Sequence, residues 1–510
     1  MIPDGFPACP YPGLRPFELA DSPVFFGQDE NIEALIERLG RARFVAVLGE
    51  SGVGKSSLVK AGLIPELRRG DTSLWRIVVF KPGVAPLQAM AEALAGAGLA
   101  KQADLVEAAS NLRGHRASLR DLIASADLPA EERVLIVVDQ FEELFRFRRK
   151  DEPGLPEGGA PNASDEEDAA LFLKLLLTAA HTSEPPVYVL VTMRSEFLGD
   201  CAAFYELGEA MNQGAFLLPR MARHQFAAAI TEPLKAYGCD IESPLLHELQ
   251  NESMALTEDG LPLLQHALRR MWDQRAGDRE GAFSMSDFMP PAAVAEKYSN
   301  RPALQVLLDA HLDKVYAEME EAGLGTATVR LMQRLGDHDR KGRLVRRAVD
   351  WDTARAVAFW ENAETTKEER EQNRELLGLI IGAFHDAGRG RFFLTGEADG
   401  RGGNSCRLEL THEVILRQWS RLWSGIATKD GLPSNSSISR NRPIGTRARR
   451  LCCEEQRSSR PRNGLLNSRR LRTGPNGIRI TTPRRGHIAT IWSERPASCE
   501  RAYGRAVTGG

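Results

Sequence analysis

The chain has 510 residues, which is too long for one hydrophobic core of ordinary size, and we expect roughly two to four domains. Its net charge of −3, with 42% hydrophobic and 26% charged residues, is ordinary for a soluble globular protein. Seven cysteines without a CxxC pair give no sign of a zinc site. Because a signal peptide and a run of about 18 apolar residues are both missing, we expect a cytoplasmic protein that does not cross a membrane.

Residues 1–43 form an N-terminal segment that begins rich in proline and ends in a predicted helix. Apolar side chains recur at i, i+3, i+4 and i+7 from Ile32 to Leu39, which is the spacing of one helical face. Gln28 or Asp29 can cap the start of this helix.

Short apolar runs then alternate with helical patterns as far as residue 218. The runs have the length and composition of buried parallel strands and cover residues 44–48, 75–80, 134–138 and 187–192. Helical patterns cover residues 55–69, 86–99, 119–124 and 169–182. The alternation predicts an α/β domain over residues 44–218, with a parallel sheet covered by helices on both faces. Residues 151–168, rich in proline, glycine and acids, are expected to form a surface loop.

The pattern becomes helical after this predicted sheet. Residues 219–297 are expected to form an all-α domain. Residues 298–426 are mostly helical as well, but two short strand-like segments, 391–395 and 407–411, interrupt them. We therefore expect two further domains.

The last 84 residues differ in composition, because residues 427–510 carry 17 Arg and one Lys against five acidic residues. A basic tail can contact nucleic acid or a membrane. This one lacks hydrophobic periodicity, so it cannot bury enough apolar surface to offset its ordering entropy, and we expect disorder. Its scattered Trp and Cys residues also fit an out-of-frame translation product, and a nucleic-acid-binding arm is the other alternative.

A glycine-rich octapeptide lies directly after the first predicted strand and directly before a helix, and it matches the phosphate-binding pattern GxxxxGK[ST]. It consists of Gly49, Glu50, Ser51, Gly52, Val53, Gly54, Lys55 and Ser56, and Ser57 follows it. Glycines with positive φ let backbone N–H groups turn toward a phosphate, and the helix N-terminus adds positive potential. Lys55 is expected to reach the β- and γ-phosphates of a nucleotide, and Ser56 to ligate Mg²⁺. A glycine-rich turn without a ligand is the alternative.

Acidic and basic groups follow two other predicted strands. Asp139 ends the apolar strand 134–138 and is expected to hold the Mg²⁺ shell at the carboxyl edge of the sheet. Glu142 and Glu143 follow, and either can orient an attacking water or simply cap the next helix or lie on its surface. Arg194 closes the fourth strand, where it can stabilise γ-phosphate charge or pair with a neighbouring glutamate.

Several separate segments resemble the STAND class of signal-transducing P-loop NTPases, and within it the novel STAND NTPase 1 domain of bacterial multidomain proteins. These segments are CPYPGLRPF at 9–17, FFG at 25–27, VLG at 47–49, GKSSL at 54–58, AGLIP at 61–65, DQFEELF at 139–145, RSEFL at 194–198 and EPL at 232–234. The resemblance covers residues 10–426. It implies that ATP and Mg²⁺ are the cofactors and that residues 298–426 form a winged-helix domain with wing strands at 391–395 and 407–411.

The resemblance also implies roles that spacing does not show. Gly27 lies in an element similar to the one that covers the base and ribose in this class, with Gln28 where an arginine is usual, which bears on the strength of nucleotide binding. Pro262 belongs to a GLP motif similar to the one that packs against the base. His412 follows a strand, so it would approach the phosphates or serve as a structural hydrogen-bonding residue.

The function implied is a signalling switch in which ATP binding and slow hydrolysis control a conformational or oligomeric change. A protein partner or self-association is then expected, and a nucleic-acid partner is not. Two alternatives remain open at this point: a mechanical AAA-like ATPase and a winged-helix DNA-binding regulator gated by ATP. The sequence does not separate ATP from GTP.

Overall fold

The fold is described by a computed structural model in which placed residues fall into separate ranges. These are 5–69, 75–83, 85–99, 119, 123, 126, 128–129, 132–148, 163–181, 186–256, 258–275, 281–290, 301–338, 344–386, 391–395 and 407–422. The tail 427–510 and most of the predicted loop 151–168 lie outside the described residues, as does most of the predicted helix 119–124.

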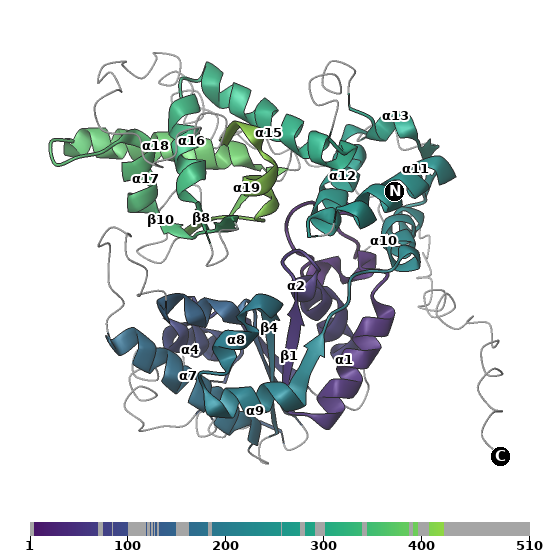
Figure 1. The fold of residues 1–510 in the computed structure, drawn as a ribbon, viewed down its shortest axis with the longest axis vertical. Coiled ribbons are helices and arrows are strands. Elements are labelled where there is room, and N and C mark those ends of the chain that lie inside the picture. Colours follow the sequence, from purple (N-terminus) through teal and green to yellow (C-terminus); the bar gives the residue numbers. More distant parts are fainter. Residues whose placement is uncertain are drawn as a thin grey trace, which may run out of the picture. The chain divides into compact units, whose positions relative to one another are not determined.

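Five parallel strands form the central sheet, in the order β2-β3-β4-β1-β5 (Figure 1). Their bounds are β1 Phe44–Gly49, β2 Trp75–Phe80, β3 Arg133–Val138, β4 Val187–Arg194 and β5 Ala215–Leu217. The four predicted strands and the parallel sheet are confirmed. The sequence did not predict β5, because three residues are too few to show a strand pattern.

Alternate residues of the strands enter two different cores, which is why the strands read as continuous apolar runs. Val45 and Val47 face α1, Asp29–Arg41, and the helix that starts at Lys55. The other face packs against three helices: α4 Pro86–Gly96, α7 Ala163–His181 and α9 Tyr205–Gly214. Helix α7 begins at residue 163, within the range 151–168 that the sequence predicts as a loop, so the loop prediction is wrong for residues 163–168.

The helix after the glycine-rich loop contains a π-helical stretch. It runs through α2 Lys55–Ser57, the π-helical residues Leu58–Leu63 and α3 Ile64–Arg69. π-Helical turns are rare and occur often at functional sites. The predicted helix 55–69 is therefore confirmed, with a local change of winding.

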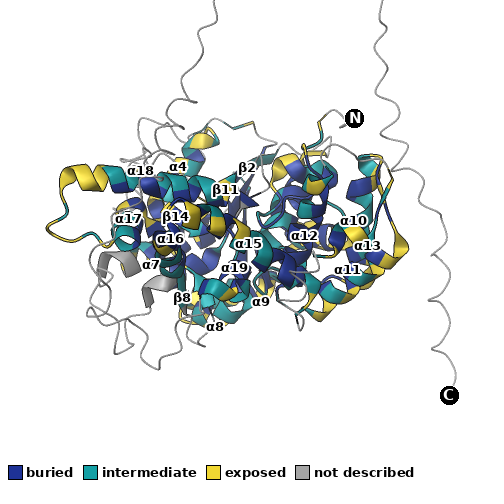
Figure 2. Cartoon of the chain, turned by 90° about the horizontal axis from the view of Figure 1, so that it is seen from above, coloured by how far each residue is buried: buried dark blue, intermediate teal, exposed yellow. Residues whose placement is uncertain are grey.

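Mostly helices follow the sheet within residues 219–297, for which the sequence predicts an all-α domain. They are α10 Arg223–Ala236, α11 Ser243–Ala255, α12 Gly260–Gln274 and the short α13 Met285–Phe288. Two short strands, β6 Asp240–Ile241 and β7 Ala282–Phe283, pair in parallel beside them. Figure 2 shows α12 buried along most of its length, whereas α11 exposes one face.

The last described region combines helices with small antiparallel sheets. Its helices are α15 Ala303–Glu321, α16 Gly325–Arg334, α17 Trp351–Phe359, α18 Lys367–Phe384 and α19 Val414–Gln418. Its strands are β8 Gly336–His338, β9 Leu344–Arg346, β10 Val349–Asp350, β11 His385–Asp386, β12 Arg391–Phe392, β13 Leu394–Thr395 and β14 Arg407–Leu410. The expected strands appear as β12, β13 and β14: β13 and β14 belong to a sheet in the order β10-β14-β13, whereas β12 pairs with β11.

One hydrophobic core joins the helical region to this last region. Leu263 and Leu264 of α12 belong to the same cluster as Leu312 of α15 and Leu416 of α19. Tyr11 brings the N-terminal segment into this core and donates a hydrogen bond of 2.5 Å to the carbonyl of Ile230. Among the described residues, no helix is both long and apolar enough to cross a membrane.

The close packing of α12 on α11 generates a stability prediction. A Cβ added at Gly260 would lie 2.0 Å from the carbonyl oxygen of Ser253, which is backbone and cannot rotate away. Gly260→Ala should therefore lower the free energy of unfolding by about 2 to 3 kcal/mol, measured by urea denaturation. Gly208→Ala is the matched control, because Gly208 lies in α9 with no atom within 4 Å of the added Cβ. Equal unfolding midpoints for the two variants would contradict this packing.

Candidate functional site

The loop between β1 and the following helix has the backbone of a phosphate-binding loop. Gly52 and Gly54 adopt φ of +80° and +98°, which side-chain-bearing residues rarely do. A Cβ at Gly52 would lie 2.8 Å from the carbonyl oxygen of Glu258. The Lys55 Nζ folds over the loop and donates to the carbonyls of Gly49 and Glu50 at 2.9 and 2.7 Å. Burial lowers the pKa of Lys55.

Asp139 accepts two hydroxyl hydrogen bonds at the edge of the sheet. The Ser56 and Thr192 hydroxyls both donate to its Oδ1 at 2.6 Å. Burial acts to raise the pKa of Asp139, but Lys60 and these two hydroxyls favour the charged form, and the pKa is lowered overall. Sequence reasoning missed Thr192, although the parallel register of β3 and β4 pairs Val138 with Val191 and so places Thr192 beside Asp139.

The two glutamates after Asp139 separate in the structure. Glu143 Oε2 accepts from the backbone N–H of Gly83 at 3.0 Å, so it supports the loop after β2. Glu142 lines the cavity instead, and its Oε1 pairs with Arg194 Nε at 3.1 Å. The second oxygen of Glu142 is buried and accepts no hydrogen bond from the described residues.

Arg194 connects the sheet edge to the last described region. Besides Glu142, it donates through Nη2 to Glu413, which lies just before α19. Glu413 also accepts from the Ser51 hydroxyl at 3.0 Å, so it bridges the phosphate-loop residue and the arginine. Burial would raise the pKa of Glu413, but Arg194 and Arg346 lower it to about 2, so the carboxylate stays charged at neutral pH.

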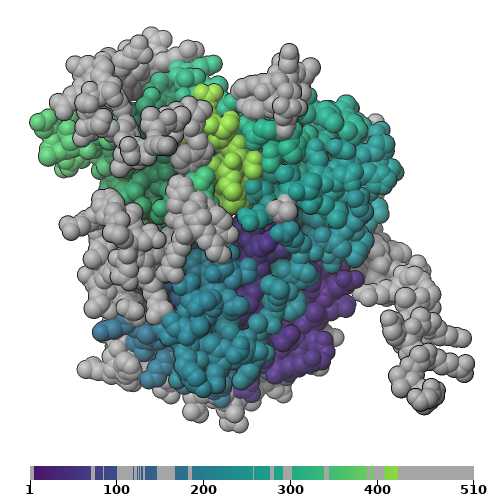
Figure 3. Space-filling model, in the orientation of Figure 1, coloured from purple at the N-terminus to yellow at the C-terminus, as the bar shows by residue number. Residues whose placement is uncertain are grey.

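The start of α12 joins the same network. Arg417 of α19 pairs with Asp259, the residue before α12, and its Nη1 lies 3.7 Å from Glu413. In Figure 3 the yellow-green atoms at the end of the described chain accordingly lie against teal atoms of the helical region. His412 lies near the phosphate loop, since its Nε2 is 3.3 Å from a Cβ built on Gly52.

The N-terminal segment approaches the site from another side. The backbone N–H of Phe17 donates to the Ser57 hydroxyl at 3.1 Å. Gly27 adopts φ +83°, and a Cβ there would lie 2.4 Å from the carbonyl oxygen of Gln225 in α10. Gly27 is therefore a packing residue, while Gln28 lines the cavity and accepts from Asn31 Nδ2 at 2.6 Å.

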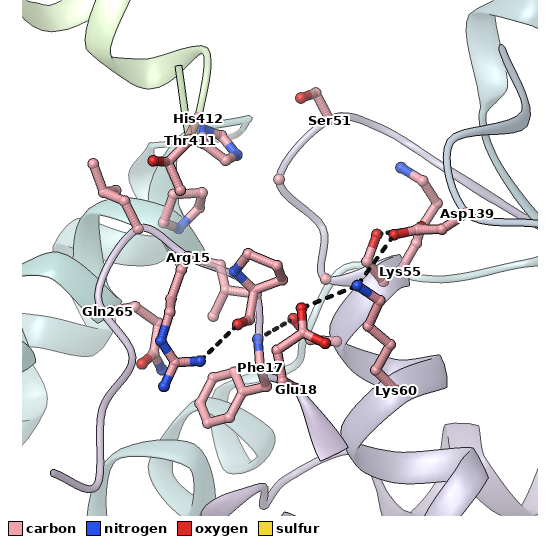
Figure 4. A pocket seen from close by; sticks show the side chains of 18 of the residues that line it. Arg15, Phe17, Glu18, Ser51, Lys55, Lys60, Asp139, Gln265, Thr411 and His412 are labelled. Atoms are coloured by element: carbon pink, nitrogen blue, oxygen red, sulfur yellow. Dashed lines mark hydrogen bonds and ion pairs between the residues drawn. The ribbon is translucent and has the colours of Figure 1, made fainter. Parts of the chain in front are cut away.

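These elements enclose a cavity of about 460 Å³ (Figure 4). The predicted site residues that line it are Ser51, Gly52, Gly54, Lys55, Ser56, Ser57, Asp139, Glu142, Arg194 and Pro262. Gly49, Glu50, Val53, Glu143 and Gly27 do not line it, and Glu50 pairs instead with Arg220 at 2.6 Å. Lining residues that sequence reasoning missed include Arg15, Lys60, Lys81 and Gln265.

Figure 4 shows two different ends to this cavity. Lys55, Lys60 and Asp139 gather at one end, whereas Arg15, Phe17 and Gln265 lie at the other. The charged end fits a polyphosphate with a divalent cation, because it combines a glycine cradle, a hydroxyl–carboxylate pair and a buried carboxylate oxygen to which no described residue donates. Phe17, Val24 and Pro262 offer apolar surface to a flat ring.

Comparison with known proteins supports this assignment. The profile of the novel STAND NTPase 1 family matches residues 10–434. No functionally curated protein is significantly similar in sequence.

Solved structures are similar only distantly. A Walker-type ATPase of Pyrococcus abyssi is 15% identical, with 80% of this chain and 99% of that chain covered and a TM-score of 0.31. Cdc6p of Pyrobaculum aerophilum is 10% identical, with 78% of this chain and 93% of that chain covered and a TM-score of 0.31. The ORC2 protein of Aeropyrum pernix, solved in ADPNP–ADP complexes, is 11% identical, with 78% of this chain and 94% of that chain covered and a TM-score of 0.35. The assignment therefore rests on the family profile together with the phosphate loop: the chain is a P-loop NTPase and belongs to the novel STAND NTPase 1 family.

Proposed function

We propose that the chain is an ATP-binding switch in which binding and slow hydrolysis of the nucleotide control a conformational or oligomeric change. The observation that carries this proposal is the composition of the cavity wall. Four parts of the chain line it: the N-terminal segment, the sheet edge, the start of α12 and the region around His412. A ligand held there would touch all four parts, so the chemical state of its phosphates can alter how they pack.

The charges of the site favour a triphosphate. Lys55 bonds to backbone carbonyls, and no side-chain carboxylate in the described part of the chain forms an ion pair with it, so its charge is free to meet a phosphate. Ser56 and Asp139 would hold Mg²⁺, which would neutralise phosphate charge and polarise the γ-phosphoryl group. The buried Oε2 of Glu142, which bonds to none of the described residues, would orient a water molecule.

Arg194 is the residue that would couple the nucleotide to the packing of the chain. It holds Glu413 in an almost buried pair, and a γ-phosphate would compete for the same guanidinium. We assign residues 219–297 to a helical domain that also contains the short strands β6 and β7, and residues 298–426 to a winged-helix domain that carries Glu413. Release of Glu413 would separate this domain from the phosphate loop and expose surface for a partner or a second copy.

The same contacts argue against a mechanical ATPase as the first choice. Such an enzyme offers an arginine to the active site of a neighbouring subunit. Arg194 instead bonds to Glu142 and Glu413 of its own chain. This arrangement favours a switch that closes on itself.

Removal of the phosphate-loop lysine tests nucleotide binding. Lys55→Ala in the full-length chain should weaken ATP binding about 100-fold, because charge-assisted hydrogen bonds to the phosphates are lost. Calorimetric titration with ATP and with GTP measures this and determines base preference. Lys235→Ala, at an exposed lysine of α10, should leave the affinity unchanged. If wild type binds neither nucleotide, the proposed function is wrong.

The two glutamates provide a matched pair for hydrolysis. Glu142→Gln should reduce the rate of ATP hydrolysis by at least about 100-fold with little loss of ATP affinity, since Glu142 faces the cavity. Glu143→Gln should retain most of the rate, because Glu143 contacts the backbone of Gly83. Single-turnover hydrolysis measures both variants. A larger loss of rate in Glu143→Gln would reverse the assignment.

The contact between Glu413 and Arg194 should determine how firmly the domain that carries Glu413 closes on the phosphate loop. Glu413→Gln keeps the shape of the side chain but removes its charge, which should weaken closure by about 2 kcal/mol, or roughly 30-fold. Hydrogen exchange at residues 411–418 should become faster by a similar factor. Glu371→Gln, at an exposed position of α18, is the control. Unchanged exchange in Glu413→Gln would show that closure depends on other contacts.

A further inference from the structure

Lys60 places a second ammonium group beside the carboxylate of Asp139. It follows Ser56 by one turn of the same helix, and its side chain is only 17% exposed. Its Nζ lies 3.6 Å from Oδ2 of Asp139, whereas the two hydroxyls of Ser56 and Thr192 bond to Oδ1. The oxygen that the hydroxyls leave open therefore faces a lysine (Figure 4).

Lys60 also has a partner outside the sheet domain. Its Nζ lies 3.0 Å from Oε1 of Glu18, whose side chain is 51% exposed. Glu18 belongs to the N-terminal segment next to Phe17, which bonds to Ser57. Lys60 thus stands between two carboxylates, and the nearer one belongs to the N-terminal wall of the cavity.

A fixed positive charge at this distance conflicts with a divalent cation on Asp139. At an effective dielectric constant of about 20, a unit charge and a divalent cation roughly 5 Å apart repel by several kcal/mol before screening. The same ammonium attracts phosphate oxygens that carry no metal. Lys60 lines the cavity, so it can act on both.

We propose that the ammonium group of Lys60 is a permanent positive charge in the phosphate site and competes with Mg²⁺ for Asp139. Lys60 thereby determines how strongly nucleotide binding depends on Mg²⁺. This inference rests on the proposed function. Lys60 partly neutralises the phosphates when the metal is scarce, and it keeps Glu18 as its carboxylate partner when Asp139 takes up Mg²⁺. Loss of the contact with Asp139 leaves the ammonium group to Glu18 alone, which strengthens the ion pair between the helix and the N-terminal segment in the Mg²⁺-bound state.

A purely structural lysine would behave differently. An ion pair that only ties the N-terminal segment to the helix would change stability when it is removed. It would not change the ratio between nucleotide affinities measured without and with Mg²⁺. That ratio is therefore the readout, and a thermal unfolding midpoint without nucleotide records the structural effect separately.

The experiment measures the dissociation constant of fluorescent mant-ATP for the full-length protein in EDTA and in saturating Mg²⁺. The readout is the constant in EDTA divided by the constant in Mg²⁺. In Lys60→Met the ratio of the two constants should rise about tenfold or more, because binding in EDTA weakens while Mg²⁺ is no longer repelled. In Glu18→Gln the ratio should fall about threefold, because the lysine loses its other partner and stays on Asp139. Lys60→Arg should restore most of the wild-type ratio.

The outcomes separate the two proposals. Opposite shifts in Lys60→Met and Glu18→Gln support the inference. If all variants bind mant-ATP with the wild-type ratio, the inference is wrong although the proposed function stands. If wild type does not bind mant-ATP at all, both are wrong. The exposed Glu18 keeps the test decisive even where Lys60→Met destabilises the fold.

Discussion

The register of three neighbouring parallel strands is the constraint on which the site depends. Gly49 at the end of β1 pairs with Arg194 at the end of β4, and Val138 at the end of β3 pairs with Val191. Carboxyl ends of parallel strands meet at one edge, so residues distant in the sequence become neighbours there. A shift of one residue in β4 would turn Thr192 away from Asp139 and remove a hydrogen bond that helps to keep the carboxylate charged.

Charge burial explains why the last region closes on this edge. The edge carries Arg194 and Glu142 away from bulk water, and an unpaired buried charge is costly. Glu413 supplies the second carboxylate for Arg194 and accepts the Ser51 hydroxyl with its other oxygen. The same contacts therefore hold Glu413 against the sheet edge and occupy the guanidinium that the proposed switch would offer to a phosphate.

Glycine positions bring the phosphate loop, α12 and the N-terminal segment into close contact. At Gly52 the loop backbone approaches Glu258, Pro262 and His412, and at Gly27 the N-terminal segment approaches α10. Neither position has room for a side chain. The conformation of the loop and the position of α12 therefore depend on each other, as the proposed switch requires.

Local pattern was sufficient for four of the five strands of the central sheet, for the glycine-rich loop and for the place of Asp139 at the end of a strand. Each of these depends on neighbours in the sequence: apolar runs, glycines before a helix, an acid after a buried strand. It did not separate Glu142 from Glu143, since both are adjacent and acidic and only the path of the chain after β2 brings Gly83 to one of them. It also missed Lys60, Thr192 and the bridge from Glu413 to Arg194. Their partners lie 42 to 219 residues away, and side chains that far apart in sequence meet only when sheet register and packing of the last region on the sheet edge bring them together.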